Sequence, residues 1–508
     1  MNACMDAAIK QLGAYFNPRS VAVVGATKRI NKAGHVIFKN FVENKHRGVF
    51  KGEVFAVNPN EASILGFQSY RSLTEIPGPL ELVVIVVPAK IVPSIMRDAV
   101  SKKVKDVVII SSGFGEIGNH DLESQVAAIG KKAGIRILGP NCLGAYDSRT
   151  GVDMLFLPET KVLTTGDEVV ATPRPIPGDI AIVTQSGAFG VAALDYLTGR
   201  QIGVSKFVSF GNKCDVTETE MLHYLLYDDE TKVILLYVED IKYGREFLEV
   251  AEKVARKKPI VALKSGRTAA GARAAASHTG AIAGSDRIYD AVFEQTGVLR
   301  AKDMEEFFGA GKALAMQPPT AGLNVGVITD AGGPGIMAVD ECELKGLTVK
   351  RFSEKTIQKF EKGKEEGRLP RFATNFNPVD ITGSGTSEMF EYAAEILFGD
   401  PEINGIVLLG LHHTPALQED YIDRVARVAD RHSKPIVACD IGETEMALQT
   451  RSRFDRLGIP AYGSPEDAAR GMNALVRYGL FLKKSGCFEE YRESFLENKR
   501  KRQRFVKA

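Results

Sequence analysis

The sequence predicts an α/β protein made of several parallel-sheet domains. Short apolar runs rich in β-branched residues alternate with amphipathic segments of helix length, which is typical of parallel sheets covered by helices. Similar strings open three such series: VAVVGATK from residue 21, AIVTQSGAFG from 181 and VGVITDAGGPG from 325. Each string predicts a buried strand, a turn of small residues and the start of a helix. A chain of 508 residues is long enough for three or four domains.

The first domain is expected to span residues 1–150, with its strand series ending near Tyr146. A stretch with four prolines, from Pro158 to Gly178, follows it and is predicted to be a linker or a surface excursion. The candidate strands of this domain are Val21–Val24, Val54–Val57, Leu82–Val87, Val107–Ile110 and Arg136–Leu138.

The rest of the chain is expected to hold a second domain at 151–317, a third at 318–480 and a basic C-terminal tail at 481–508. The string MQPPTAG, around Gln317, marks the boundary between the second and third domains. The candidate strands are Ile180–Thr184, Val233–Val238 and Ile260–Leu263 in the second domain, and Val325–Thr329, Gly405–Leu409 and Pro435–Ala438 in the third.

The charge of the chain gives no reason to expect a nucleic acid or a membrane as partner. Lys and Arg total 65 against 63 Asp and Glu, so the net charge is only +2. One basic run, at residues 499–504, lacks interleaved aromatic residues and is typical of a solvated tail.

The cysteines indicate a reducing compartment. Six cysteines are widely scattered without a C-x-x-C pair, so neither a zinc site nor a disulfide framework is predicted. The N-terminal segment lacks the apolar core of a signal peptide, and the apolar runs are too short to cross a bilayer. We therefore expect a cytoplasmic protein.

The three small-residue turns are candidate phosphate sites. A turn without bulky side chains lets backbone N–H groups at a helix N-terminus approach an anion, where the helix dipole also favours negative charge. Tight packing of a helix on its strand selects glycine as well, so each turn taken alone is open to either interpretation.

The first turn does not fit a site for NAD. That fingerprint requires G-x-G-x-x-G and an acidic residue after the second strand, whereas Gly25 stands alone and the second strand runs into Asn58-Pro59-Asn60. Polar groups follow other strands of this domain, in Val87-Pro88 and in the string SSGFGE from Ser111 to Glu116. A phosphorylated ligand other than NAD is favoured at this edge of the sheet.

His278 stands in a run of small residues, SHTGAIAG, that leaves its imidazole unshielded. A neutral imidazole can attack phosphorus when an acceptor holds its other nitrogen, and Glu239, at the end of the strand VILLYVED, is a candidate acceptor. The alternative is a solvated loop histidine and an unrelated carboxylate at a strand end. His412 and His413 are expected to be a strand-end pair near solvent.

Combinations of motifs in a fixed order carry a family resemblance from about Phe16 to about Gly479. The strings are VAVVGAT, VNPN, VVPA, SSGFGE and GPNCLG, then TQSGAFG, SFGNKCDV, YVED, LKSGRT and SHTGAIAG, then DAGGPG and NFNPVDITG. They resemble, in that order, the CoA-binding, phosphohistidine and CoA-ligase domains of the α subunit of ADP-forming acetyl-CoA synthetase, in the succinyl-CoA synthetase superfamily. YVED and GNKC vary the family's YVEG and GNKA-like strings. The resemblance implies a Rossmann-like CoA-binding domain followed by two flavodoxin-like doubly wound domains.

The resemblance also implies roles for individual residues. His278 would carry the phosphoryl group and Glu239 would orient it. One phosphate cradle would be formed by Gln185, Ser186 and Gly187, and an opposing one by Gly332, Gly333 and Gly335. CoA would bind at Gly25, Ala26, Thr27, Lys28, Asn58, Pro59, Asn60, Val87, Pro88, Ser111, Ser112, Gly113, Glu116 and Asn141.

The implied reaction interconverts acyl-CoA, ADP and phosphate with a carboxylic acid, CoA and ATP, through an acyl phosphate and a phosphohistidine. The three domains leave no room for the family's ATP-grasp domain, and no P-loop motif is present. The resemblance therefore implies an ATP-grasp β subunit as partner, in an α2β2 assembly, which supplies the ADP or ATP site together with Mg²⁺. No metal site is expected in the chain itself.

Two other functions remain as alternatives. A non-catalytic CoA-binding or scaffold subunit would keep the fold without turnover, although the intact SHTGAIAG motif argues against it. An NAD-dependent oxidoreductase is disfavoured by the missing carboxylate after the second strand. The resemblance allows acetate, branched-chain, aryl and hydroxy acids as substrates.

Overall fold

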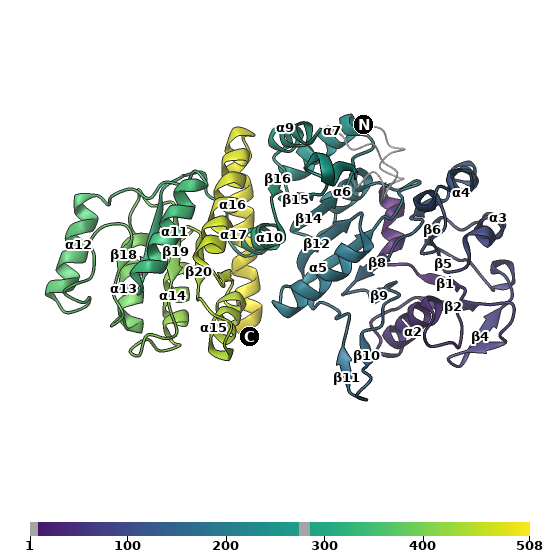
Figure 1. Ribbon diagram of the computed structural model, residues 1–508, viewed down its shortest axis with the longest axis horizontal. Helices are drawn as coiled ribbons and strands as arrows, with labels where there is room; N and C mark the ends of the chain where they lie inside the picture. Colours follow the sequence, from purple (N-terminus) through teal and green to yellow (C-terminus); the bar gives the residue numbers. More distant parts are fainter. Residues whose placement is uncertain (1–8, 274–284, 508) are drawn as a thin grey trace. The chain divides into compact units, whose positions relative to one another are not determined.

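The computed structural model describes residues 9–273 and 285–507, with side chains up to residue 501. The chain divides into two compact units, Met1–Arg300 and Ala301–Ala508 (Figure 1). The first unit holds two seven-stranded sheets and the second holds one five-stranded sheet. His278 and the motif around it lie outside the described residues.

The first sheet is a nearly all-parallel sheet with the strand order β3-β4-β2-β1-β5-β6-β7. Because β1 pairs with β2 on one side and β5 on the other, the strand order reverses there, and the turns after β1 and β5 meet at the edge where such sheets bind ligands. Its strands are β1 Ser20–Val24, β2 Glu53–Val57, β3 Ser63–Ile64, β4 Phe67–Tyr70, β5 Leu82–Ile85, β6 Asp106–Ile109 and β7 Arg136–Leu138, and its helices are α2 Ala33–His46, α3 Val92–Ser101 and α4 His120–Ala133.

The second sheet has the order β16-β15-β14-β12-β13-β8-β9. Its switch point lies at β12, which pairs in parallel with both β13 and β14. The strands β8 and β9, near the expected domain boundary at residue 150, join this sheet through antiparallel pairing of β8 with β13. The strands are β8 Gly144–Asp147, β9 Val152–Asp153, β12 Pro177–Thr184, β13 Val204–Ser209, β14 Val233–Val238, β15 Ile260–Lys264 and β16 Leu299–Ala301, and the helices are α5 Gly187–Gly199, α6 Glu218–Leu226, α7 Gly244–Ala255 and α9 Asp286–Thr296.

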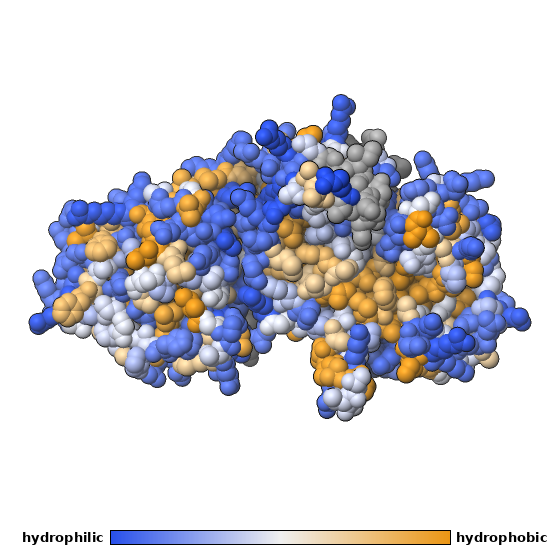
Figure 2. All heavy atoms as spheres, in the orientation of Figure 1, coloured by the Kyte–Doolittle hydropathy of each residue, from blue (hydrophilic) through white to orange (hydrophobic). Residues whose placement is uncertain are grey.

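The proline-rich stretch between these sheets contains a two-stranded antiparallel hairpin, β10 Thr160–Val162 and β11 Glu168–Val170. All six strand residues are exposed, and apolar side chains gather on the hairpin surface (Figure 2). The expected surface excursion is therefore an ordered hairpin.

The second unit is a doubly wound domain on the parallel sheet β18-β17-β19-β20-β21. Helices α10, α11 and α16 pack together, and α13 packs against α14. Its strands are β17 Val325–Thr329, β18 Val379–Asp380, β19 Gly405–Leu409, β20 Ile436–Cys439 and β21 Ala461–Tyr462, and its helices are α10 Met304–Met316, α11 Gly332–Leu344, α12 Glu354–Glu365, α13 Ser387–Phe398, α14 Tyr421–Asp430, α15 Glu445–Arg456, α16 Pro465–Lys484 and α17 Phe488–Lys507.

The region expected to be a basic tail from residue 481 is helical. Helix α16 continues to Lys484, and α17 follows from Phe488. Lys499 lies 3.9 Å from Asp430 of α14, and burial lowers the pKa of Lys499 below its usual value. No helix in the described ranges is long and apolar enough to cross a membrane.

Strand β13, at residues 204–209, was missing from the expected strands of the second domain. This strand is fully buried but contains Ser205 and Lys206. Lys206 pairs with Asp147 at 3.1 Å and Asp228 at 2.9 Å, and Ser205 bonds Thr231 at 2.8 Å. Partners distant in sequence therefore engage Ser205 and Lys206, which break the apolar pattern.

Asp106, at the start of β6, is a buried carboxyl group that the fold leaves only partly satisfied. It is 2% exposed, and its Oδ1 has no hydrogen-bond partner among the described residues. Burial raises the pKa of Asp106 to about 8, against the opposing effects of Arg136 and Gln11. An unfolded aspartate titrates near 3.9, so folding retains a proton that the unfolded chain releases. This aspartate therefore lowers the stability progressively as the pH rises from about 4 to about 8.

We expect Asp106→Asn to stabilise the first unit, and to do so more at about pH 9 than at about pH 5, because the asparagine never carries the buried charge. The gain in melting temperature should grow by at least about 3 °C over this range. Asp229→Asn, which changes an exposed aspartate of the same unit, is the control and should give a nearly constant difference. A gain at Asp106 that does not change with pH would contradict the raised pKa.

Candidate active site

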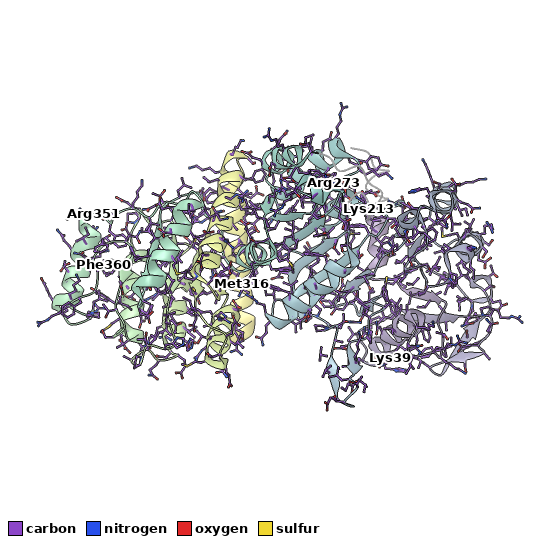
Figure 3. The ribbon with its side chains drawn as sticks, in the orientation of Figure 1. Lys39, Lys213, Arg273, Met316, Arg351 and Phe360 are labelled. Atoms are coloured by element: carbon purple, nitrogen blue, oxygen red, sulfur yellow. The ribbon has the colours of Figure 1, made fainter. Side chains whose placement is uncertain are left out.

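A cleft of about 1170 Å³ lies at the carboxyl ends of the strands of both sheets in the first unit. Lys213, which lines it, lies between the elements of the two sheets (Figure 3). The cleft brings together residues that the sequence analysis assigned to a ligand-binding edge and to a phosphate turn. They are Val87, Pro88, Ser111, Ser112, Glu116, Asn141, Gln185, Ser186, Gly187 and Glu239.

The side chain of Thr184 shapes the turn from β12 to α5 through two hydrogen bonds to the backbone of Ser186. The Thr184 hydroxyl donates to the Ser186 carbonyl at 2.9 Å and accepts from the Ser186 N–H at 3.2 Å. Ser186 caps α5, because its Oγ accepts from the Phe189 N–H at 3.2 Å. Among the described contacts, the first-turn N–H groups of Gly187 and Ala188 stay available for an anion.

Gln185 is placed differently from the expectation that it cradles phosphate. Its side-chain Oε1 accepts from the N–H groups of Glu239 at 2.5 Å and Asp240 at 3.0 Å, and its Nε2 donates to the Asp240 carbonyl at 2.7 Å. Its own N–H donates to the Tyr237 carbonyl at 3.3 Å. Gln185 therefore holds the end of β14, and the open N–H groups of this turn are those of Gly187 and Ala188.

Glu239 follows β14 directly and is half-buried on the wall of the cleft. Tyr237, two residues earlier, stacks on Phe189 with ring centroids 4.1 Å apart. Burial raises the pKa of Tyr237, Ser265 opposes this through a hydrogen bond, and the nearby Glu239 adds to the rise. A neutral phenol therefore lies beside the Glu239 carboxylate. His278, the expected partner of Glu239, lies outside the described residues.

The turn after β1 is not part of the cleft lining, and several of its hydrogen-bonding groups are engaged. Glu61 accepts from the Thr27 hydroxyl at 2.6 Å and from the Lys28 N–H at 3.0 Å. Asn58 donates to the Ala26 carbonyl at 2.8 Å. No carboxylate was expected after the second strand, but Glu61 supplies one. The residues that lie away from the lining are Gly25, Ala26, Thr27, Lys28, Asn58, Pro59, Asn60 and Gly113.

The N-terminus of α2 lies beside this turn and borders the cleft. Lys32 and Ala33 line the cleft, and α2 begins without a side-chain cap on its first N–H groups. A lysine at a helix N-terminus is unfavourable for the helix alone. It is favourable when an anion binds there, so the missed residue Lys32 belongs to the candidate site.

Asn212 joins the two sheets at the floor of the cleft. Its Nδ2 donates to Glu116 and to Glu123, both at 2.7 Å, and its Oδ1 accepts from Asn141 at 3.3 Å. Burial tends to raise the pKa of Glu116, but hydrogen bonds from Asn212 and the Gly113 N–H outweigh it, so this pKa lies below its usual value. Glu116 is therefore an ionised carboxylate that fixes the joint. The quoted string SFGNKCDV contained Asn212, but its role was not assigned.

The second unit repeats the geometry of the β12–α5 turn at the end of β17. The Thr329 hydroxyl donates to the Ala331 carbonyl at 2.8 Å and accepts from the Ala331 N–H at 3.0 Å, as Thr184 does with Ser186. Helix α11 then begins at Gly332, which is exposed together with Gly333. Both turns have the sequence pattern T-x-x-G-x-x-G, a shared signal that was not among the expected motifs.

Near this second turn, His413 is exposed as expected for a strand-end pair near solvent, whereas His412 is half-buried. Its side chain is 6% exposed, and its Nδ1 lies 2.8 Å from Asp440, whose pKa is raised by burial and lowered in part by this contact. Asp330, between β17 and α11, accepts from Thr414 at 2.8 Å, and burial raises the pKa of Asp330 to about 6.

No group of three His, Cys, Asp or Glu suited to a metal ion occurs in the described part of the chain.

Three family models match successive parts of the chain. A CoA binding domain matches residues 19–147, a succinyl-CoA ligase like flavodoxin domain matches 177–314, and a ligase-CoA domain matches 325–474. These matches confirm the predicted fold class, a Rossmann-like domain followed by two flavodoxin-like domains.

Individual proteins match nearly the whole chain. The subunit alpha of acetate–CoA ligase (ADP-forming) I of Pyrococcus furiosus is 38% identical, over 93% of this chain and 99% of that protein. The acetate–CoA ligase (ADP-forming) of Methanocaldococcus jannaschii is 36% identical, over 94% of this chain and 65% of that protein. A solved structure of dinucleotide forming acetyl-coenzyme A synthetase 1 of Ca. Korarchaeum cryptofilum, in complex with phosphate and ADP, has a TM-score of 0.83 at 33% identity and covers 93% of this chain and 98% of that one.

Gly25 is required by the packing of the strands. Its φ is +95°, and a Cβ there would lie 2.2 Å from the Val86 carbonyl oxygen. We expect Gly25→Ala to lower the melting temperature of the first unit by several degrees more than Gly66→Ala. Gly66 also has a positive φ, of +82°, but open space around it, so its substitution costs only about 1–2 kcal/mol of backbone strain. Equal losses, measured by thermal denaturation, would show that the contact with Val86 does not constrain this turn.

Proposed function

The chain belongs to the family of ADP-forming acetate–CoA ligase α subunits, and on this premise we propose the reaction that it performs and the residues that perform it. The reaction interconverts acyl-CoA, ADP and phosphate with carboxylic acid, CoA and ATP. The observation that supports it best is the single cleft shared by the edge of the first sheet, the α5 turn and Glu239.

CoA is proposed to bind along the first-sheet side of this cleft. The uncapped N-terminus of α2 and the Lys32 ammonium offer hydrogen bonds and positive charge to the CoA phosphates. Val87, Pro88, Ser111 and Ser112 form the adjoining wall. The thioester would then extend toward the α5 turn at the opposite side of the cleft.

The first chemical step is proposed to occur at Gly187 and Ala188. Phosphate held by their N–H groups attacks the thioester carbonyl, the C–S bond breaks, and CoA leaves as a thiolate that takes up a proton. The product is an acyl phosphate. The helix N-terminus stabilises the phosphoryl oxygens throughout the step.

The second step is proposed to place the phosphoryl group on His278. Its imidazole attacks the phosphorus, the bond from phosphorus to the acyl oxygen breaks, and the carboxylate leaves. Glu239 would accept a hydrogen bond from the other ring nitrogen and so favour the reactive tautomer. ADP then takes the phosphoryl group from His278 to give ATP.

The nucleotide is proposed to be bound by an ATP-grasp β subunit, in an α2β2 assembly in the cytoplasm. This chain aligns with 99% of a relative named as a subunit alpha, but with only 65% of the M. jannaschii ligase, whose name mentions no subunit. Mg²⁺ would enter with the nucleotide. Gly332, Gly333 and Gly335 would form the second phosphate cradle, next to the nucleotide of the partner.

We expect acetyl phosphate to label the purified chain with a phosphoryl group that is lost in acid and retained in base, the behaviour of a phosphohistidine. His278→Ala should abolish the label and the turnover, because the nucleophile is absent, and should leave CoA affinity within about twofold. His432→Ala, in the second unit, is the control for loss of a histidine. A label that persists in His278→Ala would assign the phosphoryl carrier to another residue.

The isolated chain is expected to make no ATP from acyl-CoA, ADP and phosphate, and to do so once the ATP-grasp subunit is added. The reason is that the chain provides the carrier histidine and the CoA site, while the partner provides the nucleotide site. A coupled luciferase assay with acetyl-CoA and with branched-chain and aryl acyl-CoAs measures this. ATP formed by the chain alone would contradict the two-subunit reaction, and inactivity of the pair with every thioester would favour a non-catalytic subunit.

A further inference from the structure

Lys213 lies in the turn between β13 and α6 and is one of the most constrained residues of the cleft. It has a left-handed backbone, with φ of +54°, and it is 6% exposed. Its ammonium donates to Glu218 at 3.2 Å, to the Asp240 carboxylate at 2.9 Å and to the Asp240 carbonyl at 3.0 Å. An ammonium has three N–H groups, so these contacts use its full capacity.

The acceptors of Lys213 are also held by Gln185. The Gln185 amide donates to the Asp240 carbonyl at 2.7 Å and to Glu218 at 3.4 Å, while its carbonyl oxygen accepts from the N–H groups of Glu239 and Asp240. The N–H groups of Glu239 and Asp240 and the Asp240 carbonyl are therefore all hydrogen-bonded. Movement of the main chain that carries the Glu239 carboxylate would break several of these bonds together.

Stability alone gives a weak reason for such a charge cluster. Glu218 is completely buried, and burial raises the pKa of Glu218, which Lys213 counteracts. A buried ion pair often contributes little compared with apolar residues of similar size, because desolvation offsets the attraction. Lys213 differs from an ordinary buried lysine because it lines the cleft and bonds the residue next to Glu239.

We propose that Lys213 is a positioning residue, which fixes the carboxylate of Glu239 for phosphoryl transfer by anchoring Asp240. The inference rests on the proposed function, in which Glu239 orients the carrier histidine. Without Lys213, the Asp240 carboxylate next to Glu239 has lost its counter-ion, and the Asp240 carbonyl keeps only its bond from Gln185. Small displacements of an orienting group are enough to slow a transfer step substantially.

The chain offers a matched control in Lys206 of β13. Lys206 is also 6% exposed and is paired with two carboxylates, those of Asp147 and Asp228, but it does not line the cleft. Lys206→Met and Lys213→Met thus each remove one buried, doubly paired ammonium from the same unit. A purely structural role of Lys213 predicts similar behaviour of the two variants.

The test measures the single-turnover rate of phosphoryl labelling by acetyl phosphate, CoA affinity by calorimetry, and the melting temperature. Lys213→Met should label at least about tenfold more slowly than the natural chain, as Glu239→Gln should, with CoA affinity unchanged within about twofold. Lys206→Met should lose a comparable melting temperature but label within about twofold of the natural rate.

The double variant Lys213→Met/Glu218→Gln keeps the test valid if Lys213→Met alone does not fold. It also removes the charge of Glu218, which is buried and loses its ammonium partner in Lys213→Met. We expect this double variant to regain stability while labelling stays slow. Labelling of either Lys213 variant at the rate of Lys206→Met would overturn the inference and leave the proposed function standing. Absence of label in the natural chain would overturn the proposed function, and the inference with it.

Discussion

The close approach of each glycine-rich helix to the strand before it is the constraint on which the site depends. A Cβ at Gly190 of α5 would lie 3.0 Å from the Thr184 methyl group of β12, and one at Gly335 of α11 would lie 2.8 Å from the Thr329 methyl group of β17. Only glycine lets these helices start directly at the carboxyl edge of their sheets. The free N–H groups of the first turn then face the same edge as the ends of the neighbouring strands. The N–H groups of Gly187 and Ala188 and the carboxylate of Glu239 therefore line the same cleft.

The turn at residues 211–213 extends this constraint from one sheet to the next. A Cβ at Gly211 would lie 2.2 Å from the carbonyl oxygens of Pro140 and Asn141, so the turn packs directly against the end of the first sheet's domain. Asn212 then bonds the acidic groups on the first-sheet side, and Lys213 bonds those on the second-sheet side. Three consecutive residues therefore set the geometry between the side that would hold CoA and the side that would hold phosphate.

The parts of the fold that follow from local sequence were predicted, and the parts that depend on distant partners were not. Strands such as β1 and β14 are continuous apolar runs, which identify them from local pattern alone. Strand β13 was missed because Lys206 has its partners about 22 and 59 residues away, where no local pattern shows them. Glu61 and Gln185 show the same limit within the site. Glu61 engages a turn more than 30 residues earlier, and Gln185 bonds a strand end 54 residues later, so neither contact could be derived from motif position.

The repeat of one turn in both compact units has an energetic consequence for a carrier mechanism. Thr184 and Thr329 shape their turns with the same pair of hydrogen bonds, and each turn ends in a helix that starts at a glycine. Two turns built alike would stabilise a phosphoryl group to a similar extent, so the turns themselves would add little to the free-energy difference between its two positions. That difference would then depend on the groups to which the phosphoryl group is bonded. The side chains around the two turns differ, with Gln185 and Glu239 at one and Asp330 and His412 at the other, so the distinction between an acyl and a nucleotide reaction would lie in these neighbours rather than in the turns.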